Sequence, residues 1–453
     1  MAQIFIDGRF VDAATATVRE VANPATAKPV GHCAECGVVD VEQATVAARA
    51  ARVDWSACSS DARRAALKAA AAALRRGREG IETLLIAEGG LTGREARTAL
   101  EASANALEQP VRRAMGLNGG VRAILGPASS PLLPIMRDVA SALLAGETVV
   151  LKPAPGAALA QLEAARAWAG LPPGVVNVLS GDAALGQALV AHAGIDAVSF
   201  TGSAGVGAAL AVGGRPLQLH TGGADAAIVA RDADLDLAVR AVAWSRLRHG
   251  GRSCASSRRL YVHSAVADEF VTRLHQYVGL LEVDNPVKPA VVLGPLASAD
   301  AAKRCEGRVV KSMREGARLV LGGFRFRPSG LAGYWLQPTI LTDVRQGALA
   351  MREEMAGPIL TVTPYTDEDV LQRWVAEAAD PLGVSVFGAD EDALCSLVAA
   401  LHVHTIWVNL PQSDDVPPAQ PGAAVRVYRP AYARNSTPDF YELDPLQVGS
   451  LVE

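Results

Sequence analysis

The stretch TVVLKPAPG, residues 148–156, decides the fold class of this chain. A short apolar run is followed at once by a lysine and by a turn rich in proline and glycine, which is how a buried strand ends. Residues 157–170 then carry a helical pattern. Strand, turn and helix in this order form the repeating unit of a parallel sheet covered by helices, so the stretch predicts an α/β fold.

The same order repeats on both sides of this stretch. VRAIL (121–125) precedes a predicted helix over 132–145, and VVNVLSG (175–181) precedes one over 182–193. AVSFTGS (197–203) leads into a further helix. Consecutive strand–helix units with Gly and Pro junctions predict a parallel sheet with helices on both faces.

A second α/β domain is indicated after residue 255. The alternation restarts with RRLYV (258–262) and a predicted helix over 264–280, and apolar runs continue as far as TIWVN (405–409). The tail, residues 412–453, is rich in proline and has an irregular pattern.

The first hundred residues have a different pattern. Residues 2–36 alternate like a β-hairpin, and residues 40–108 are predicted to be helical. We expect the second helix to run over 61–90, with Asp61 as its cap.

The composition excludes several classes of protein. The 453 residues carry a net charge of −4, and no block of basic residues suits nucleic acid. We find no secretory pattern at the N-terminus and no apolar run of the roughly 20 residues that a membrane span needs. Six cysteines in so long a chain do not form a disulfide scaffold. We therefore expect a cytoplasmic protein that binds neither nucleic acid nor a membrane.

The segment HCAEC, residues 32–36, has a C-x-x-C spacing. A zinc site needs about four ligands, and no second pair of suitable spacing follows. We interpret these cysteines as structural residues of an exposed hairpin, and we expect no metal site.

Three positions suit nucleotide binding or covalent chemistry. Lys152 directly follows an apolar strand and can reach a ribose or a phosphate, although a surface lysine would give the same pattern. In SFTGSAGVG (199–207), small residues let a backbone approach a pyrophosphate. Cys254 lies between a glycine pair and a strand-like run in RHGGRSCASSRRLYV (248–262). A thiolate there could be a nucleophile, and an ordinary buried cysteine is the alternative.

These segments together resemble the aldehyde dehydrogenase superfamily from end to end, and the chain is identified as a divergent member of it. The matching motifs follow the family's order and are VVLKP, FTGS, LHTGGADAAIVARDADLD, GGRSCASSRRLYV, GPLAS, GYWLQPTILTDV, EEMAGPIL and TIWVN.

The resemblance implies an aldehyde dehydrogenase-like α/β fold with a Rossmann-type cofactor domain, an α/β catalytic domain and a shortened oligomerisation arm. The implied boundaries are 1–107 and 122–222 for the nicotinamide dinucleotide-binding domain, 223–412 for the catalytic domain, and 108–121 and 413–453 for the reduced bridging elements.

The resemblance also implies a role for single residues. Cys254 would be the nucleophile that attacks an aldehyde, and NAD or NADP would be the cofactor. The cofactor-binding residues would be Lys152 at the adenine ribose, Gly202 and Ser203 at the pyrophosphate turn, Gly222 at a close backbone approach, and Glu354 at the nicotinamide ribose.

Several functional positions depart from the family's pattern. Ser129, in PASSP, replaces the asparagine that donates to the oxyanion, and His220 replaces the glutamate that acts as a base. A histidine can do that work near neutral pH, or it can be a structural residue in the cleft. Asp138 stands where the family has a lysine. Pro155 replaces an acidic residue, so NADP should be tolerated, and Ala356 replaces an aromatic residue.

Two longer departures concern assembly. Only about 15 residues, roughly 108–122, are available for the family's oligomerisation arm, and the usual glycine-rich segment is not recognisable in the tail. A homodimer and a monomer therefore both stay open.

Three functions follow from these observations. The first is NAD(P)-dependent oxidation of an aldehyde to a carboxylic acid, with Cys254 as nucleophile, His220 as base and Ser129 as oxyanion donor. The second is an acylating reaction in which coenzyme A takes the acyl group, because water activation is then unnecessary. The third is a degenerate relative that binds a partner on an intact fold. Ester hydrolysis at Cys254 is a further alternative.

Overall fold

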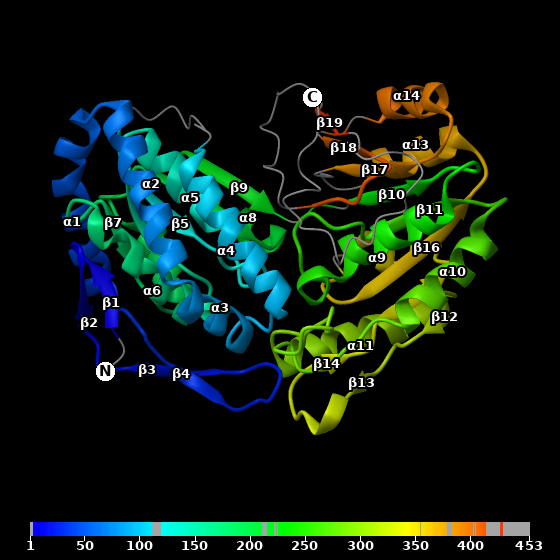
Figure 1. The fold of residues 1–453 in the computed structure, drawn as a ribbon, viewed down its shortest axis with the longest axis horizontal. Coiled ribbons are helices and arrows are strands. Elements are labelled where there is room, and N and C mark those ends of the chain that lie inside the picture. Colours follow the sequence, from blue (N-terminus) through cyan, green and yellow to red (C-terminus); the bar gives the residue numbers. More distant parts are fainter. Residues whose placement is uncertain are drawn as a thin grey trace. The chain divides into compact units, whose positions relative to one another are not determined.

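The computed structural model describes residues 3–110, 119–210, 215–221, 223, 225–353, 355–377, 383–401, 403, 405–413 and 426–428. The chain divides into two compact units, Met1–Thr221 and Gly222–Glu453. Each unit is built on one large sheet with helices, which confirms the predicted α/β class (Figure 1).

The first sheet has seven strands in the order β2-β1-β7-β6-β5-β8-β9. An antiparallel hairpin of β1 and β2 forms one edge, and β1 also pairs antiparallel with β7. The other neighbouring strands are parallel. The strands are β1 (Gln3–Ile6), β2 (Arg9–Asp12), β5 (Val121–Leu125), β6 (Thr148–Lys152), β7 (Val176–Val178), β8 (Ala197–Gly202) and β9 (Leu217–Thr221).

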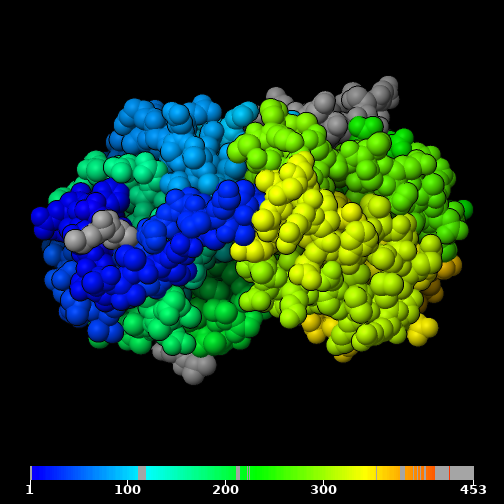
Figure 2. Space-filling view, turned by 90° about the horizontal axis from the view of Figure 1, so that it is seen from below, coloured from blue at the N-terminus to red at the C-terminus, as the bar shows by residue number. Residues whose placement is uncertain are grey.

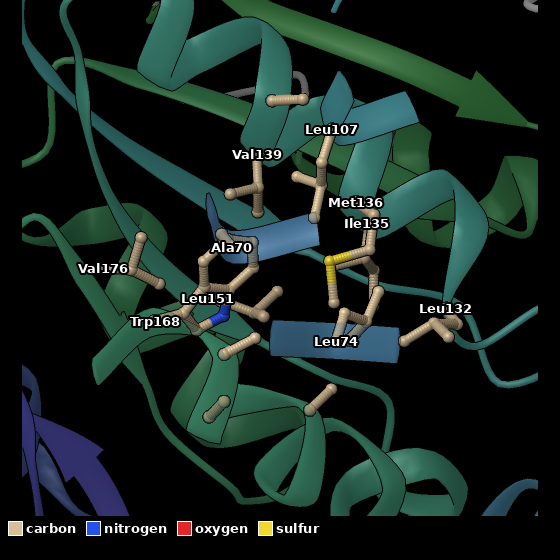
Figure 3. Close-up of a cluster of buried hydrophobic side chains, with 14 of the residues drawn as sticks. Ala70, Leu74, Leu107, Leu132, Ile135, Met136, Val139, Leu151, Trp168 and Val176 are labelled. Carbon is tan, nitrogen blue, oxygen red and sulfur yellow. The ribbon is translucent and has the colours of Figure 1, made fainter. Parts of the chain in front are cut away.

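Side-chain alternation along these strands gives the sheet two apolar faces. In β6, Val149 and Leu151 belong to one hydrophobic cluster and Val150 to another. The first cluster includes side chains of α2, α4 and α5, such as Leu74, Leu107 and Met136 (Figure 3). Helices on both faces explain why the strands read as nearly continuous apolar runs.

The helices of the first unit follow the predicted order with corrections. They are α1 (Val38–Ala57), α2 (Ser60–Arg76), α3 (Arg78–Ala87), α4 (Gly93–Glu108), α5 (Leu133–Leu144), α6 (Ala158–Ala164), α7 (Ala183–Ala191) and α8 (Ala204–Leu210), with 3₁₀ turns at Pro155–Ala157 and Ala165–Gly170. The single helix predicted over 61–90 is two helices, because the chain breaks at Gly77.

The predicted cap of α2 was also wrong. Ser59, not Asp61, has the extended conformation of a cap, and its hydroxyl accepts a hydrogen bond from Ala62 N at 3.2 Å. Asp61 lies inside the first turn, where a carboxylate faces the positive end of the helix dipole.

The hairpin of β3 (Val18–Ala22) and β4 (Pro29–Ala34) carries the HCAEC segment. His32 is exposed as expected, but Cys33 is fully buried against Val21 and Ala158, because this hairpin packs on α6. Among the described residues, no group of three His, Cys, Asp or Glu side chains could hold a metal ion.

The second sheet has eight strands in the order β12-β15-β16-β11-β10-β17-β18-β19. Only the pair β12 and β15 is antiparallel. β19 falls in the tail that we expected to be irregular, and it extends the sheet by pairing with β18. The strands are β10 (Ala226–Val229), β11 (Arg259–His263), β12 (Arg318–Leu321), β15 (Thr339–Thr342), β16 (Ile359–Tyr365), β17 (Val384–Phe387), β18 (Thr405–Val408) and β19 (Arg426–Tyr428).

The helices of this unit are α9 (Leu235–Gly251), α10 (Ala267–Gly279), α11 (Ala299–Arg314), α12 (Leu349–Arg352), α13 (Glu368–Ala376) and α14 (Glu391–Ala400). The segment from α11 to the small hairpin β13 (Arg325–Phe326) and β14 (Trp335–Leu336), coloured yellow-green to yellow, forms much of one face of the unit (Figure 2). None of the described helices combines the length and the apolarity that crossing a membrane requires.

Candidate active site

The carboxyl edge of the first sheet gathers several predicted residues. Lys152 is the last residue of β6, Gly202 is the last of β8, and His220 pairs with Thr201 near the end of β9. Ser129 lies in the bend after β5. The chain passes from β7 back across β5 to β8, and ligands of such sheets bind at the carboxyl edge where the strand order reverses.

Lys152 is a buried cation at this edge. Its exposed fraction is 6%, and Nζ donates a hydrogen bond to Pro153 O at 3.3 Å. Burial, with a further contribution from the positive charge of Arg19, lowers the pKa of Lys152 to about 8. An ammonium group has three donors, so Nζ can also donate to the hydroxyls of a ribose or to a phosphate. This donor therefore fits a dinucleotide cofactor.

The turn between β8 and α8 is closely packed at Gly202. A Cβ added there would lie 2.5 Å from the Phe200 ring, so a larger residue would require the ring to move. Ser203 is exposed, and its carbonyl accepts a hydrogen bond from Gly207 N at 3.0 Å in the first turn of α8. Small residues thus keep the backbone of this turn accessible.

Ser129 is half-buried between β5 and α5, and the neighbouring Ser130 is buried. A serine hydroxyl can donate one hydrogen bond, which is the property an oxyanion donor needs.

His220 and Asp138, two of the departures from the family pattern, lie together. Nε2 of His220 is 3.7 Å from Oδ1 of Asp138, and Asp138 is buried on α5. Oδ2 of Asp138 accepts a hydrogen bond from Ser199 Oγ at 2.5 Å. Nε2 of Gln218 lies 2.9 Å from the same ring nitrogen of His220. We predicted both departures from the sequence, but not that they form a pair.

In the second unit, Cys254 follows the distorted end of α9. His249 and Gly250 have positive φ angles of 52° and 68°, and Gly251 has a φ of 72°. A Cβ on Gly251 would lie 2.1 Å from Gly357 O, so only glycine fits. This abrupt turn leads to Cys254, which is half-buried in the loop before β11.

Arg246 holds this loop from inside the core. The side chain is fully buried, and Nε donates to Ile359 O at 2.8 Å. Nη1 donates to Gly251 O at 3.0 Å and to Ser256 Oγ at 3.2 Å, while Nη2 donates to Met355 O. One guanidinium thus connects the cysteine loop to residues 355–359.

Arg258 makes a second connection. Its Nη1 donates to Gly223 O at 2.6 Å, and its Nη2 donates to Ser253 O at 3.3 Å. Arg258 thereby connects Ser253, the residue before Cys254, to Gly223. We did not predict a role for Arg246 or Arg258, although a charged residue within the apolar run AVAWSRL was a signal of a buried, bonded side chain.

Two predicted cofactor residues, Gly222 and Glu354, lie outside the described residues. So do residues 111–118 of the predicted arm and most of the predicted tail element.

The comparison with protein families decides the identity. The model of the aldehyde dehydrogenase family matches residues 10–422. The chain belongs to the aldehyde dehydrogenase family. The matched residues cover nearly the whole chain, which confirms the resemblance noted from the sequence.

Individual aldehyde dehydrogenases support this assignment. The chain is 32% identical over 397 residues to 3,6-anhydro-alpha-L-galactose dehydrogenase of Vibrio sp. (strain EJY3), which covers 82% of this chain and 83% of the relative. Lactaldehyde dehydrogenase from Escherichia coli superposes with a TM-score of 0.85 at 29% identity and covers 90% of this chain and 91% of its own. A 3,6-anhydro-L-galactose dehydrogenase in complex with NAP superposes with a TM-score of 0.85 at 27% identity. The match covers 91% of this chain and 92% of that structure's chain.

The chain is thus an aldehyde dehydrogenase enzyme of a family that uses NAD or NADP, with its own residues at several usual positions. Pro155 is exposed at the start of a 3₁₀ turn after Lys152. Ala356, where the family has an aromatic residue, accepts a hydrogen bond at its carbonyl from Cys305 Sγ at 2.8 Å.

Proposed function

We propose that this aldehyde dehydrogenase oxidises a small aldehyde to a carboxylic acid with NAD or NADP, and that Cys254 is the nucleophile. The observation that carries the proposal is the loop around Cys254. It lies within the matched residues 10–422, and two buried arginines, Arg246 and Arg258, fix it.

Three side chains act in the proposed reaction: a nucleophile, a base and a hydrogen-bond donor. The Cys254 thiolate attacks the carbonyl carbon and forms a thiohemiacetal, while His220 takes the thiol proton. Ser129 donates a hydrogen bond to the oxygen on which negative charge develops. A bound nicotinamide supplies the hydride acceptor that the oxidation requires. Loss of hydride from the thiohemiacetal leaves a thioester, and His220 releases the thiol proton to solvent. The neutral His220 then removes a proton from water, the hydroxide attacks the thioester, and the acid leaves as the Cys254 thiolate re-forms.

The cofactor is assigned to the first unit. Lys152 would hold the adenine ribose, and Gly202 with Ser203 would approach the pyrophosphate. Gly222 and Glu354 complete the proposed set. The boundaries proposed from the sequence give residues 1–107 and 122–222 to cofactor binding and 223–412 to catalysis. Pro155 stands where a carboxylate would repel the 2′-phosphate of NADP. We therefore expect the protein to accept NADP in addition to NAD.

An acylating reaction is the second candidate. It is favoured by the absence of a glutamate at position 220, since transfer of the acyl group to coenzyme A needs no activated water. A homodimer and a monomer both stay open, and a cytoplasmic location stays a prediction.

Formation of reduced nicotinamide tests these candidates. Purified protein is assayed with NAD and with NADP against a panel of small aldehydes, with and without coenzyme A, beside Cys254→Ser. Signal that needs Cys254 but no coenzyme A supports oxidation to the acid. Signal only with coenzyme A identifies the acylating reaction. Wild-type turnover by Cys254→Ser, or silence in every assay of the folded protein, refutes the proposal.

A further inference from the structure

We propose that Asp138 is a positioning residue that sets the orientation and the reactive nitrogen of His220. The inference rests on the proposed function, because it gives His220 a supporting carboxylate for its role as base. Asp138 stands where the family has a lysine, and His220 stands where it has a glutamate. The acidic and the basic residue have thus exchanged positions, and the two replacements lie close together.

The geometry identifies which ring nitrogen faces the protein. Nε2 of His220 lies 3.7 Å from Asp138 Oδ1 and 2.9 Å from the Gln218 amide nitrogen. Oε1 of Gln218 is buried and has no hydrogen-bond partner in this orientation. Turning the amide by half a rotation brings this oxygen to the ring, where it accepts a hydrogen bond from Nε2–H. An ionised carboxylate can only accept hydrogen bonds, so Asp138 favours the tautomer that carries its hydrogen on Nε2 and directs it toward Oδ1.

The consequence is that Nδ1 is the basic nitrogen. A proton from the attacking thiol, or later from water, goes to Nδ1 and makes the ring an imidazolium. Asp138 stays ionised and stabilises this charge at ion-pair distance. Release of the Nδ1 proton to solvent restores the neutral ring. One nitrogen held by a carboxylate while the other moves the proton is the general arrangement of a histidine base.

Asp138 is itself fixed. It is buried, and Ser199 Oγ on β8 donates to its second oxygen at 2.5 Å. The carboxylate therefore points at β9 in one orientation.

We next consider the charged side chains on the described elements of the first unit that pack near β9. β8 and α8, which pack against β9, carry no ionisable side chain, and α5 contributes Arg137 and Asp138. Arg215, just before β9, donates its guanidinium hydrogens to the carbonyls of residues 190–192.

The test is a double-mutant cycle of Asp138→Asn and His220→Gln in the full chain. Asparagine keeps an oxygen that accepts from Ser199, so the packing is retained. We expect His220→Gln to lower kcat about 100-fold and Asp138→Asn about 10-fold or more. The double variant should be no slower than His220→Gln alone, because Asp138 acts only through the ring. The KM for the aldehyde should change less than about twofold.

The controls separate positioning from folding. Asp40 is another buried aspartate of the first unit; it accepts hydrogen bonds from Ala14 N and Gly37 N at 2.7 and 2.8 Å. Asp40→Asn should lower the melting temperature without lowering kcat. Nitrogen-15 NMR of the histidine rings, assigned with His220→Gln, gives a readout independent of turnover. The neutral ring should carry its hydrogen on Nε2, and Asp138→Asn should shift it toward the other tautomer.

The outcomes are distinct. Additive losses in the cycle, or a neutral His220 ring with its hydrogen on Nδ1, overturn the positioning role and leave the proposed function standing. Wild-type kcat in His220→Gln removes the base from the proposed function, and the positioning role fails with it.

Discussion

Gly357 N donates a hydrogen bond to Gly251 O at 3.1 Å, so the loop before Cys254 and the loop before β16 are in direct backbone contact. The contact is possible because Gly251 has a positive φ and no Cβ. Two loops distant in the sequence are therefore held together at the proposed nucleophile.

Gly251→Ala should disrupt this contact. The new Cβ would lie 2.1 Å from Gly357 O, and the left-handed conformation disfavours alanine, so we expect a loss of more than about 1 kcal/mol in the free energy of unfolding. We also expect a large fall in kcat. Urea unfolding and steady-state turnover measure the two effects. Gly279→Ala is the matched control, because no atom lies within 4 Å of its added Cβ. Equal behaviour of the two variants would show that the loop tolerates the change.

Arg246→Met should destabilise the second unit. It removes the guanidinium donors from the carbonyls of Met355 and Ile359, and a buried group left unpaired costs about 1–3 kcal/mol. Gly251 O also loses the guanidinium but keeps its hydrogen bond from Gly357 N. Arg246→Lys keeps the charge, but an ammonium group cannot reproduce the planar set of donors by which the guanidinium bonds all three carbonyls. We therefore expect a melting temperature between those of the wild type and Arg246→Met, and reduced turnover. Thermal denaturation measures the melting temperature, and Arg314→Met, at an exposed arginine, is the control. A wild-type melting temperature and wild-type turnover in Arg246→Lys would show that the three guanidinium hydrogen bonds are not needed.

Glu88 should make stability depend on pH. Its oxygens accept hydrogen bonds from Leu159 N and Ala160 N, but burial raises its pKa from 4.5 to about 6. The folded state therefore binds the proton more tightly than the unfolded state. This contribution is full below about pH 4.5 and is lost as pH rises through 6, which amounts to about 2 kcal/mol.

Glu88→Gln should flatten this dependence. Urea midpoints at pH 5 and 7.5 measure it, and the exposed Glu79→Gln in the first turn of α3, the helix that Glu88 caps, should keep the wild-type slope. The same slope in Glu88→Gln would assign the effect to other groups.

Lys152 should make cofactor affinity depend on pH. Its pKa of about 8 means that the ammonium is charged at pH 7 and largely neutral at pH 9. A cofactor that binds the charged form therefore binds most tightly at pH 7 and below, and more weakly as pH rises through 8. Lys152→Met should weaken NADP binding about 10-fold or more at pH 7 and remove the pH dependence, and titration calorimetry measures both. The exposed Lys68→Met should behave as wild type. Equal pH dependence in Lys152→Met and wild type would exclude Lys152 as the source.

The fold could be predicted where one short segment contained the whole signal. The strand at 148–152 and helix α5 followed from an apolar run, turn residues and helical periodicity. The helix break at Gly77 was missed, because helix-forming residues stand on both sides of it. Strand β19 was missed because its three residues depend on pairing with β18, which no local pattern shows.

The candidate site was predictable by position rather than by contact. Lys152 and Cys254 stand beside segments with strong local patterns. The pair of Asp138 and His220 requires the packing of α5 against the register of β8 and β9. Arg246 donates to Ile359 O, a partner 113 residues away, so only the folded chain shows why a charge is buried there.

The hydrophobic clusters of the described residues are each drawn from a single unit: for example, Phe5 to Val178 in one, and Ala226 to Ile406 in another. Because each half contains its own core, heat absorption need not follow one all-or-none transition. We expect differential scanning calorimetry to resolve two overlapping peaks, with a van't Hoff enthalpy smaller than the calorimetric one. Changes at Glu88 would then move one peak and changes at Arg246 the other, and the thermogram would report which half a substitution weakens.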